Sequence, residues 1–388
     1  MNVASRARGL LTQALGAYQD SPRAANWLGR QLERFDEPLR LAVVGPPRSG
    51  KSTLVQAIGE IPGELTLIDA PPPAPDTIEN ICLEADAVLY LVRHPHGADL
   101  DFLYTLQDHP IARAAAVNAI VVLSRADELG GGRLEALISA RRLARRYRCE
   151  PELRGLCQDV VAVAGLLARA GRNLSQPEYD ALAELARIER AKLEPYLLSA
   201  DRFSTISPGH ATLLERFGLF GIRVAISLLR QEARSLTELS AELLPRSGLS
   251  ELLESIDGNF AQRREVLKAR SALLGLEVVL RMEPRPAAAA IGAELERTLA
   301  SAHDFTELRL LAAIRTGRVS LPRDFQQEAV QLVGGHGVGP AERLAEVDLS
   351  ESIARWREFA ESPGLGSDQR RAAAVVLRSC EAMASGAL

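Results

Sequence analysis

The sequence predicts an α/β domain built on a parallel β-sheet, joined to an all-α region. From residue 39 to about residue 170, short apolar runs alternate with helical patterns, which is typical of a parallel sheet with helices on both faces. Beyond about Gly171 no strand pattern recurs, and apolar residues repeat at helical spacing. We therefore expect three parts: N-terminal helices in residues 1–36, the α/β domain in residues 37–200 and a helical region in residues 201–388.

The composition is that of a helix-rich protein without a membrane span. The 388 residues are 47% hydrophobic but only 4% aromatic, and the net charge is −4. No apolar stretch reaches the roughly 18 residues of a transmembrane helix, and the N-terminus lacks the pattern of a signal peptide. Cys82, Cys149, Cys157 and Cys380 have no CxxC spacing, so we expect reduced thiols and no zinc site. These features favour a cytoplasmic protein that binds no nucleic acid and meets the inner face of the cell membrane only peripherally.

The α/β domain is predicted from five short apolar segments, each bounded by Gly, Pro or charged residues. The candidate strands are Leu39–Val44, Leu65–Asp69, Ala87–Val92, Ala119–Ser124 and Val160–Ala164, with helical patterns between them at Leu100–Ala116 and Arg133–Tyr147. A further helix, Pro177–Ser199, is expected to close the domain.

Helices precede and follow these strands. Residues 3–18 and the segment after Ser21-Pro22 each carry an apolar stripe at helical spacing, and both stripes need a partner elsewhere in the chain. Ser207-Pro208 offers a cap and a first-turn proline for a long helix that ends before Pro245. The later helices are expected at Leu249–Met282, Ala288–Ala302, Phe305–Thr316, Phe325–Val333, Ser352–Glu361 and Gln369–Ala384.

A glycine-rich motif directly follows the first strand. The segment from Gly45 to Ser52 matches G-x-x-x-x-G-K-S and lies between an apolar strand and a helical pattern, as a P-loop does. Such a loop turns its N–H groups inward to form an anion cradle, and the helix start adds its positive end. Lys51 is expected to reach the β- and γ-phosphates, and Ser52 to bind Mg²⁺. The residues expected to bind nucleotide here are Gly45, Pro46, Pro47, Arg48, Ser49, Gly50, Lys51, Ser52 and Thr53.

A carboxylate at the end of the second strand completes the expected metal site. Asp69 ends the apolar run Leu65–Asp69, and an acidic residue in this position after a P-loop holds Mg²⁺ directly or through water. We therefore expect Ser52 and Asp69 to hold the metal together.

The end of the fourth strand is expected to recognise the base. Ser124-Arg125-Ala126-Asp127 stands where GTPases carry an Asn/Thr-Lys-x-Asp motif. A carboxylate there accepts hydrogen bonds from N1–H and the exocyclic amine of guanine, which adenine cannot match, and arginine can stack over the ring. Ala164 lies where a further base-contacting loop is expected. The sequence therefore predicts a P-loop GTPase-type domain that binds GTP or GDP with Mg²⁺.

Longer segments resemble a known family. Leu123–Arg133 and Leu214–Arg223 are similar to segments of the isoniazid-inducible, dynamin-like GTPases of actinobacteria, of the IniC type, and Glu242–Leu249 and Phe260–Arg264 strengthen the likeness. The likeness covers nearly the whole chain. It implies a GTPase head on a helical neck and stalk, membrane remodelling at the inner membrane, and an oligomer with itself or with another dynamin-like GTPase. It also implies that the N-terminal helices pack with later helices in the neck.

The chain departs from that family after Lys51. Only 17 residues separate Lys51 from Asp69, and a helix of about three turns and a strand of about five residues use them all. No room remains for the antiparallel second strand or for switch I, whose Thr ligates Mg²⁺. Pro72 stands in place of a glycine whose N–H would reach the γ-phosphate. We therefore expect nucleotide to bind better than it is hydrolysed, and we assign no catalytic residue.

Three functions remain open from the sequence. The leading one is a dynamin-like protein that binds guanine nucleotide, is degenerate in hydrolysis and acts in membrane remodelling or maintenance. The first alternative is an active GTP-hydrolysing enzyme completed by a partner, and the second is a scaffold that binds no nucleotide. An ATP-using protein is disfavoured by Asp127.

Two surface features also have two interpretations each. Val278, Val279, Leu280 and Met282 surround the end of a predicted helix, where they either pack in a core or touch a membrane or partner. Several arginines between residues 141 and 148 form a basic helix end, which is either a solvated face or a contact for acidic lipid or nucleic acid.

Overall fold

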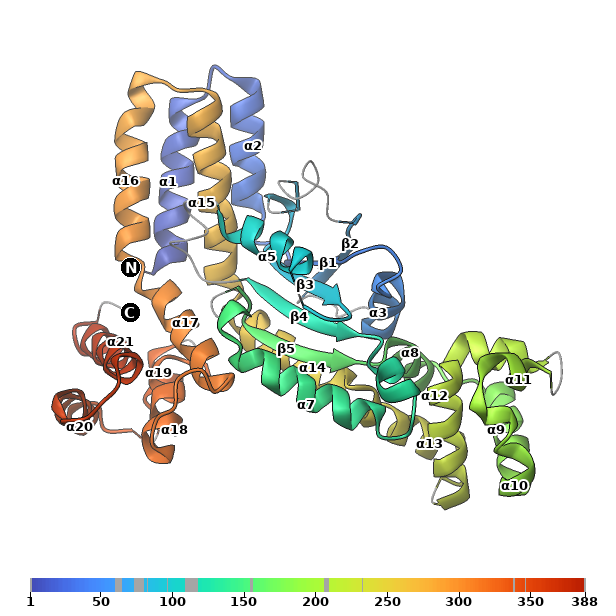
Figure 1. Cartoon of the computed structure of the whole chain (residues 1–388). Coiled ribbons are helices and arrows are strands. Elements are labelled where there is room, and N and C mark those ends of the chain that lie inside the picture. Colours follow the sequence, from blue (N-terminus) through green and yellow to red (C-terminus); the bar gives the residue numbers. More distant parts are fainter. Residues whose placement is uncertain are drawn as a thin grey trace.

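The computed structural model describes residues 2–386 except 60–64, 73–79, 82, 96, 109–117, 154–155, 206–208, 232, 338 and 346. A parallel sheet lies in the middle of the molecule, a bundle of long helices stands on one side of it, and further helices form groups at two other ends (Figure 1). The N- and C-terminal ends lie near each other beside the lower end of the bundle. No helix among the described residues is long and apolar enough to cross a bilayer.

The central sheet has five parallel strands in the order β2-β1-β3-β4-β5. Every residue of β3 and β4 is buried, as expected for continuous apolar strands covered on both faces. The first four strands have the predicted bounds. The fifth is shifted by one residue, because Ala164 forms the N-cap of the next helix instead of extending the strand. The strands are β1 (Leu39–Val44), β2 (Leu65–Asp69), β3 (Ala87–Val92), β4 (Ala119–Ser124) and β5 (Asp159–Val163).

Helices cover both faces of the sheet, and the alternation along β1 separates them. Leu39, Leu41 and Val43 pack with apolar residues of α3 and α14, whereas Ala42 and Val44 belong to the cluster that includes α5 and α7. If β1 were displaced by one residue against its neighbouring strands, the residues that now face α3 and α14 would face the opposite side of the sheet. The pairing register of β1 is therefore strongly specified. The elements around the sheet are α3 (Lys51–Ile58), α5 (Ala98–Asp108), η1 (Ala126–Gly131), α7 (Ala136–Cys149), η2 (Pro151–Leu153), α8 (Gly165–Arg172), η4 (Pro245–Ser247) and α14 (Leu249–Asn259). Residues 109–116 of the helix expected at 100–116 lie outside the described residues.

A second group of helices extends from the carboxyl end of the sheet. Its apolar residues belong to the same hydrophobic cluster as α5 and α7, so α12 and α13 pack with the α/β part although they follow residue 200. The helix predicted for residues 177–199 is present only in its first half, because the chain leaves α9 after Arg187 and continues in two shorter elements. Arg230 donates to the carbonyls of Ala186 and Ile188 at the end of α9. The group comprises α9 (Gln176–Arg187), α10 (Arg190–Leu193), η3 (Tyr196–Leu198), α11 (Ala200–Ser204), α12 (Gly209–Gln231) and α13 (Leu236–Leu243).

The single helix predicted between Ser207-Pro208 and Pro245 is also divided. Ser207 and Pro208 lie outside the described residues. The chain leaves helical geometry at Gly218 within α12, and a separate helix, α13, starts after Ser235, whose side chain accepts a hydrogen bond from the Glu238 N–H at 3.2 Å.

Long helices from two distant parts of the chain stand side by side in the upright bundle of Figure 1. Buried residues of α1, α2, α15 and α16 share one hydrophobic cluster, which confirms that the N-terminal stripes pack with later helices. The predicted helix Leu249–Met282 is broken at Phe260, because Phe260 packs beneath the sheet while Val266 packs in the bundle. The elements are α1 (Val3–Ala17), α2 (Pro22–Glu33), η5 (Ala261–Arg263), α15 (Arg264–Met282), η6 (Pro286–Ala288) and α16 (Ala289–Ser301).

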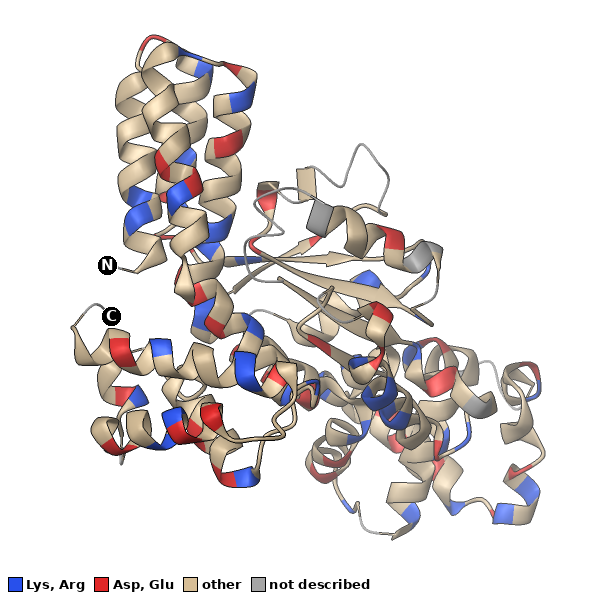
Figure 2. Ribbon diagram, turned by 60° about the vertical axis from the view of Figure 1, so that its left-hand side comes forward, with Lys and Arg blue, Asp and Glu red and all other residues tan. Residues whose placement is uncertain are grey.

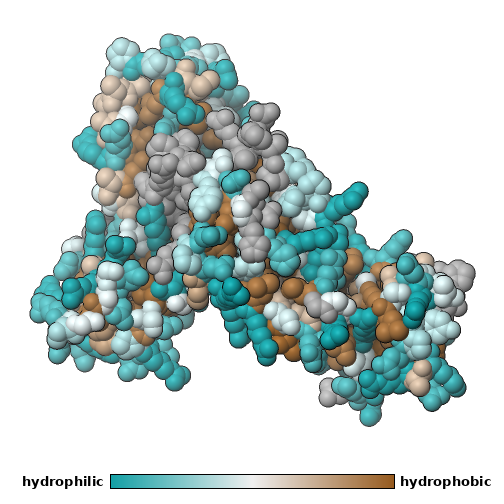
Figure 3. All heavy atoms as spheres, in the orientation of Figure 1, coloured by the Kyte–Doolittle hydropathy of each residue, from teal (hydrophilic) through white to brown (hydrophobic). Residues whose placement is uncertain are grey.

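The end of this bundle is mostly core. Val279 is buried among bundle residues, Val278 and Leu280 are partly buried, and Met282 is 62% exposed. Arg285 bonds to Asp20 in the turn between α1 and α2 and lies over the Tyr18 ring. In the view of Figure 3 the end of the bundle is largely hydrophilic.

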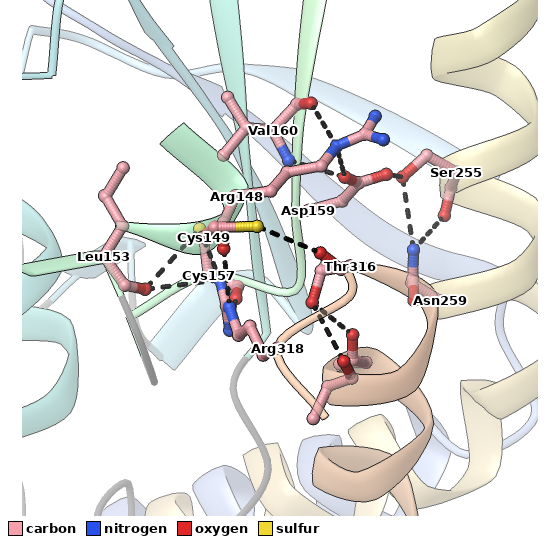
Figure 4. A network of polar contacts seen from close by, with 12 residues as sticks. Arg148, Cys149, Leu153, Cys157, Asp159, Val160, Ser255, Asn259, Thr316 and Arg318 are labelled. Carbon is pink, nitrogen blue, oxygen red and sulfur yellow. Dashed lines mark hydrogen bonds and ion pairs between the residues drawn. The ribbon is translucent and has the colours of Figure 1, made fainter. Parts of the chain in front are cut away.

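The last helices form a separate hydrophobic cluster around Trp356. A polar junction connects this cluster to the sheet domain (Figure 4). Arg318 donates to the carbonyls of Arg148 and Cys157 at 2.9 and 3.0 Å, and the Cys149 Sγ lies 3.8 Å from the Thr316 carbonyl. The helices are α17 (His303–Arg315), α18 (Arg323–Leu332), α19 (Pro340–Arg343), α20 (Leu349–Glu361) and α21 (Ser367–Ala384).

The arginines of α7 contact neighbouring elements. Arg141 pairs with Glu251 at 2.9 Å, and Arg148 pairs with Asp159 at 2.7 Å. Acidic and basic residues are interspersed over the molecule in Figure 2. At least part of this basic helix end therefore holds α7 to α14 and β5.

Candidate functional site

The glycine-rich loop, residues 45–50, joins the end of β1 to α3 in a conformation that few residues tolerate. A Cβ on Gly45 would lie 2.5 Å from the Leu91 carbonyl oxygen, so no side chain fits there. Arg48 and Gly50 both have left-handed backbone angles, with φ of 62° and 93°. Left-handed residues turn their neighbouring N–H groups to one side and favour anions. Pro46 and Pro47 have no N–H and the Ser49 N–H donates to the Pro46 carbonyl oxygen at 3.2 Å, so the loop offers fewer donors than a P-loop without prolines. The positive end of α3, which begins at Lys51, lies at the same place.

The Lys51 ammonium group lies over this loop. Its Nζ donates to the Gly45 carbonyl oxygen at 2.8 Å and to the Pro46 carbonyl oxygen at 3.4 Å. The charge is therefore held beside the N–H groups of the loop. A bound phosphate would offer this cation a charged acceptor in place of neutral carbonyls, and charge-assisted hydrogen bonds are the stronger kind.

Ser52 and Asp69 meet at the adjacent strand end. The Ser52 Oγ donates to the Asp69 Oδ2 at 2.7 Å, because β2 pairs with β1 so that Asp69 lies opposite Val43. Both residues are exposed. One hydroxyl and one carboxylate suit Mg²⁺, which takes few protein ligands and completes its shell with phosphate oxygens and water. Among the described residues no group of three or more His, Cys, Asp or Glu could hold a metal ion, so a metal here would depend on such additional ligands.

The η1 loop begins directly after β4 and presents Asp127. Ser124 is buried and donates to the Val92 carbonyl oxygen at 3.3 Å. Arg125 has a left-handed φ of 53°, which turns the chain sharply into η1. Its guanidinium pairs with Glu128 at 2.7 Å and reaches the Arg48 carbonyl oxygen at 3.0 Å. The side chain of Arg125 thus links the η1 loop to the glycine-rich loop.

The half-buried Asp127 carboxylate has no hydrogen bond from a described side chain. Burial raises its pKa, and a hydrogen bond from its own backbone N–H and the nearby Arg125 only partly oppose this effect. The partial burial of a carboxylate carries a desolvation cost, which a ligand offering further N–H donors would reduce.

A single cavity of about 170 Å³ brings these loops together. Its lining includes Ser49, Gly50 and Thr53 from the glycine-rich loop and α3, and Ser124, Arg125 and Asp127 from the end of β4 and η1. It also includes the apolar residues Leu54, Leu91, Val122, Val163 and Leu166. This combination of an apolar wall and a few polar groups is typical of a small-molecule site.

The cavity is lined by only part of the residues expected from the sequence: residues 45–48, Lys51, Ser52 and Asp69 lie outside its lining. Ala164 is fully buried as the N-cap of α8, and the two residues after it, Gly165 and Leu166, line the cavity. Leu91, Val122 and Glu128 were not expected. For the part of the cavity formed by Gly165 and Leu166, the only indication in the sequence is that Val161–Gly165 lies at the end of a strand.

The expectation that a helix and a strand use all the residues between Lys51 and Asp69 is wrong, because α3 has only eight residues and residues 59–64 separate it from β2. α3 ends at Ile58, β2 begins at Leu65, and β2 pairs in parallel with β1 along its whole length. Of the residues between them only Gly59 is described. Pro72 is exposed shortly after β2.

Comparison with known proteins places the chain in a family. No family model and no solved structure matches it. The chain is 31% identical to the isoniazid-induced protein IniC of Mycobacterium tuberculosis, in strains CDC 1551 / Oshkosh and ATCC 25618 / H37Rv, over 486 aligned positions that cover 99% of this chain and 98% of the relative. Because 486 positions exceed the 388 residues of this chain, the relative contains segments that this chain lacks. The chain belongs to the family of isoniazid-induced protein IniC.

Proposed function

We propose that this protein binds guanine nucleotide in the cavity between the glycine-rich loop and the η1 loop. The observation that carries the proposal is that one cavity is lined both by Ser49, Gly50 and Thr53 and by Asp127. An anion-binding loop and a carboxylate that no described side chain bonds, both beside one largely apolar space, match a nucleotide, which has phosphates at one end and a base with N–H donors at the other.

The phosphate end would use the P-loop. The N–H groups of Arg48 and Gly50 and the start of α3 would bind the β-phosphate, and Lys51 would exchange its bonds to the Gly45 and Pro46 carbonyls for phosphate oxygens. Ser52 and Asp69 would hold Mg²⁺, which neutralises phosphate charge when bound.

The base end would distinguish guanine from adenine. Guanine offers N1–H and an exocyclic amine side by side, and both can donate to the two oxygens of Asp127. Adenine presents an acceptor at N1 and would leave the half-buried carboxylate without that compensation. The Arg125 stem, fixed by Glu128 and the Arg48 carbonyl, can cover the ring.

Hydrolysis is expected to be slow. The interval between α3 and β2 is short, and Pro72 has no N–H to offer a γ-phosphate. GTP and GDP should therefore bind with similar affinity, since little in the chain distinguishes them.

The resemblance of the sequence to dynamin-like GTPases supports a role in membrane remodelling, alone or with a more complete partner GTPase. A single-turnover assay with GTP, without and with such a partner, shows whether hydrolysis needs the partner. Fast hydrolysis by the protein alone would contradict the expectation that its hydrolysis is slow.

Calorimetric titration tests the proposal. The protein with Mg²⁺ is titrated with GDP and with ADP, and we expect GDP to bind at least about tenfold more tightly. Lys51→Ala should abolish binding of GDP. Lys192→Ala is the matched control, because Lys192 is exposed on α10 and pairs with Glu189 at 3.1 Å, and it should bind as the unaltered protein does. Equal affinity for GDP and ADP, or equal effects of the two lysine variants, would contradict the assignment.

A further inference from the structure

We infer that helix α12 positions the guanine-recognition loop: Gly218 and Arg223 hold η1 so that Asp127 faces the cavity, and selectivity for guanine depends on them. The inference rests on the proposed function and extends it to residues outside every nucleotide-binding motif of the sequence. These residues lie in Leu214–Arg223, one of the segments that resembles the family and that the nucleotide site does not otherwise use.

The first contact is at the kink of α12. Gly218 has φ of 64° and ψ of 167°, which is not helical. Here the helix backbone passes so close to the site that a Cβ on Gly218 would lie 3.4 Å from Leu166 Cδ1 and 3.9 Å from Asp127 Oδ2. Leu166 and Asp127 both line the cavity. The kink therefore forms the wall directly behind the carboxylate.

The second contact holds the far end of η1. The Arg223 Nη1 donates to the carbonyl oxygen of Gly132, the C-cap of η1, and its Nε donates to the Leu197 carbonyl oxygen at 3.0 Å. Gly132 has φ of 66°, and a Cβ there would lie 3.3 Å from the Asp127 carbonyl oxygen. Since the backbones of Gly132 and Asp127 lie this close together, a guanidinium that holds Gly132 in place also restricts the movement of the Asp127 backbone.

Two further contacts tie α12 to the rest of the site. A Cβ on Gly221 would lie 3.4 Å from Leu167 Cδ1 of α8, so the two helices pack closely. Arg169 of α8 donates to the Glu215 carbonyl oxygen on α12 at 3.4 Å and to Gln56 Oε1 on α3 at 3.2 Å. The helices that begin at the cavity, α3 and α8, thus share one hydrogen-bonding side chain with α12.

Loss of the Arg223 contact should weaken guanine recognition specifically. The phosphate end would keep its contacts, while Asp127 would lose its fixed orientation toward N1–H and the amine. A hydrogen bond to a charged group is worth roughly 10- to 150-fold in affinity. We expect Arg223→Ala to weaken GDP binding at least about tenfold and to leave ADP binding unchanged, so that the ratio of the two affinities falls.

Three variants test this by calorimetric titration with GDP and ADP. Arg223→Lys keeps a cation that can donate to Gly132 and should restore part of the selectivity lost in Arg223→Ala. Arg230→Ala is the matched control, because Arg230 lies on the same helix and donates to the Ala186 and Ile188 carbonyls, at 3.0 and 2.7 Å. It should keep the full preference for GDP. Equal losses for GDP and ADP in Arg223→Ala, or the same loss of selectivity in Arg230→Ala, would overturn the positioning role.

Hydrogen exchange separates this inference from the proposed function. In the nucleotide-free protein, amides of residues 126–132 should exchange faster in Arg223→Ala than in Arg230→Ala. If the unaltered protein binds neither nucleotide, the proposed function fails, and the exchange rates still show whether α12 holds η1. If GDP binds selectively and the exchange rates of the two variants are equal, the inference alone fails.

Discussion

Asp127 is the residue on which base recognition depends, and its titration should be visible in binding. Burial raises its pKa above the ordinary value of 3.8, and only the ionised form accepts both guanine donors. GDP affinity should therefore fall as the pH decreases through this raised pKa, at a higher pH than an ordinary aspartate would give. Titrations of GDP across pH 4–8 check this. Asp127→Asn should bind GDP weakly at every pH and lack the titration, and an unchanged profile in that variant would contradict the role of Asp127.

The cysteines should differ sharply in reactivity. Cys149 is exposed, whereas Cys157 and Cys380 are buried, and burial raises their thiol pKa values to about 11 and about 12. At pH 8 only about one Cys157 thiol in a thousand would be ionised, and the thiolate is the reactive form. Iodoacetamide should therefore modify Cys149 first, as measured by peptide mass spectrometry. Modification of Cys157 in the folded protein at the rate of Cys149 would contradict this burial. Cys82 lies outside the described residues.

At the scale of elements, α15 is a core helix of the bundle whose last turn reaches the surface. Val279 is 6% exposed and Met282 is 62% exposed. Val279→Asp buries a carboxylate without a partner, so its melting temperature should fall sharply, while Met282→Glu should melt as the unaltered protein does. Circular dichroism measures both. Equal melting temperatures would show that Val279 does not pack in the bundle. Membrane contact by this end of the bundle stays a prediction, and sedimentation of the Met282 variant with anionic vesicles addresses it.

Strands could be predicted more accurately than helix ends, for a physical reason. A strand buried on both faces is a continuous apolar run, so β1, β3 and β4 begin and end where the pattern does. The helix breaks at Gly218 and Phe260 and the end of α9 depend on distant contacts, such as the Arg230 guanidinium on the carbonyls of Ala186 and Ile188. No local pattern reports such contacts.

The same distinction applies to the candidate site. The glycine-rich loop and Asp127 could be found because the chemistry of phosphate and guanine binding requires particular residues at fixed spacing. Leu166 and Gly218 approach the site only through the packing of α8 and α12. Their residue types are ordinary for a helix, so the sequence offered little to identify them.

At the scale of the whole molecule, the bundle is joined to the sheet domain through a buried ion pair. Arg34, after α2, lies 2.7 Å from Asp86, which precedes β3, and their side chains are 7% and 2% exposed. Removing one partner of a buried pair costs about 3–5 kcal/mol. Arg34→Ala should therefore lower the free energy of unfolding by about that amount in urea denaturation. The exposed pair of Arg357 and Glu381 is the control, and Arg357→Ala should change little. Similar losses in both variants would contradict a structural role for this junction.

A crystal structure with GDP and Mg²⁺ would show whether a nucleotide spans the cavity and the adjoining glycine-rich loop. We expect the base against Asp127 and Arg125, the phosphates within residues 45–53, and the metal at Ser52 and Asp69. We also expect α12 to remain in contact with the η1 loop through Gly218 and Arg223. Crystals grown with saturating GDP that hold no nucleotide in this cavity, or that hold one with the base turned away from Asp127, would contradict this expectation.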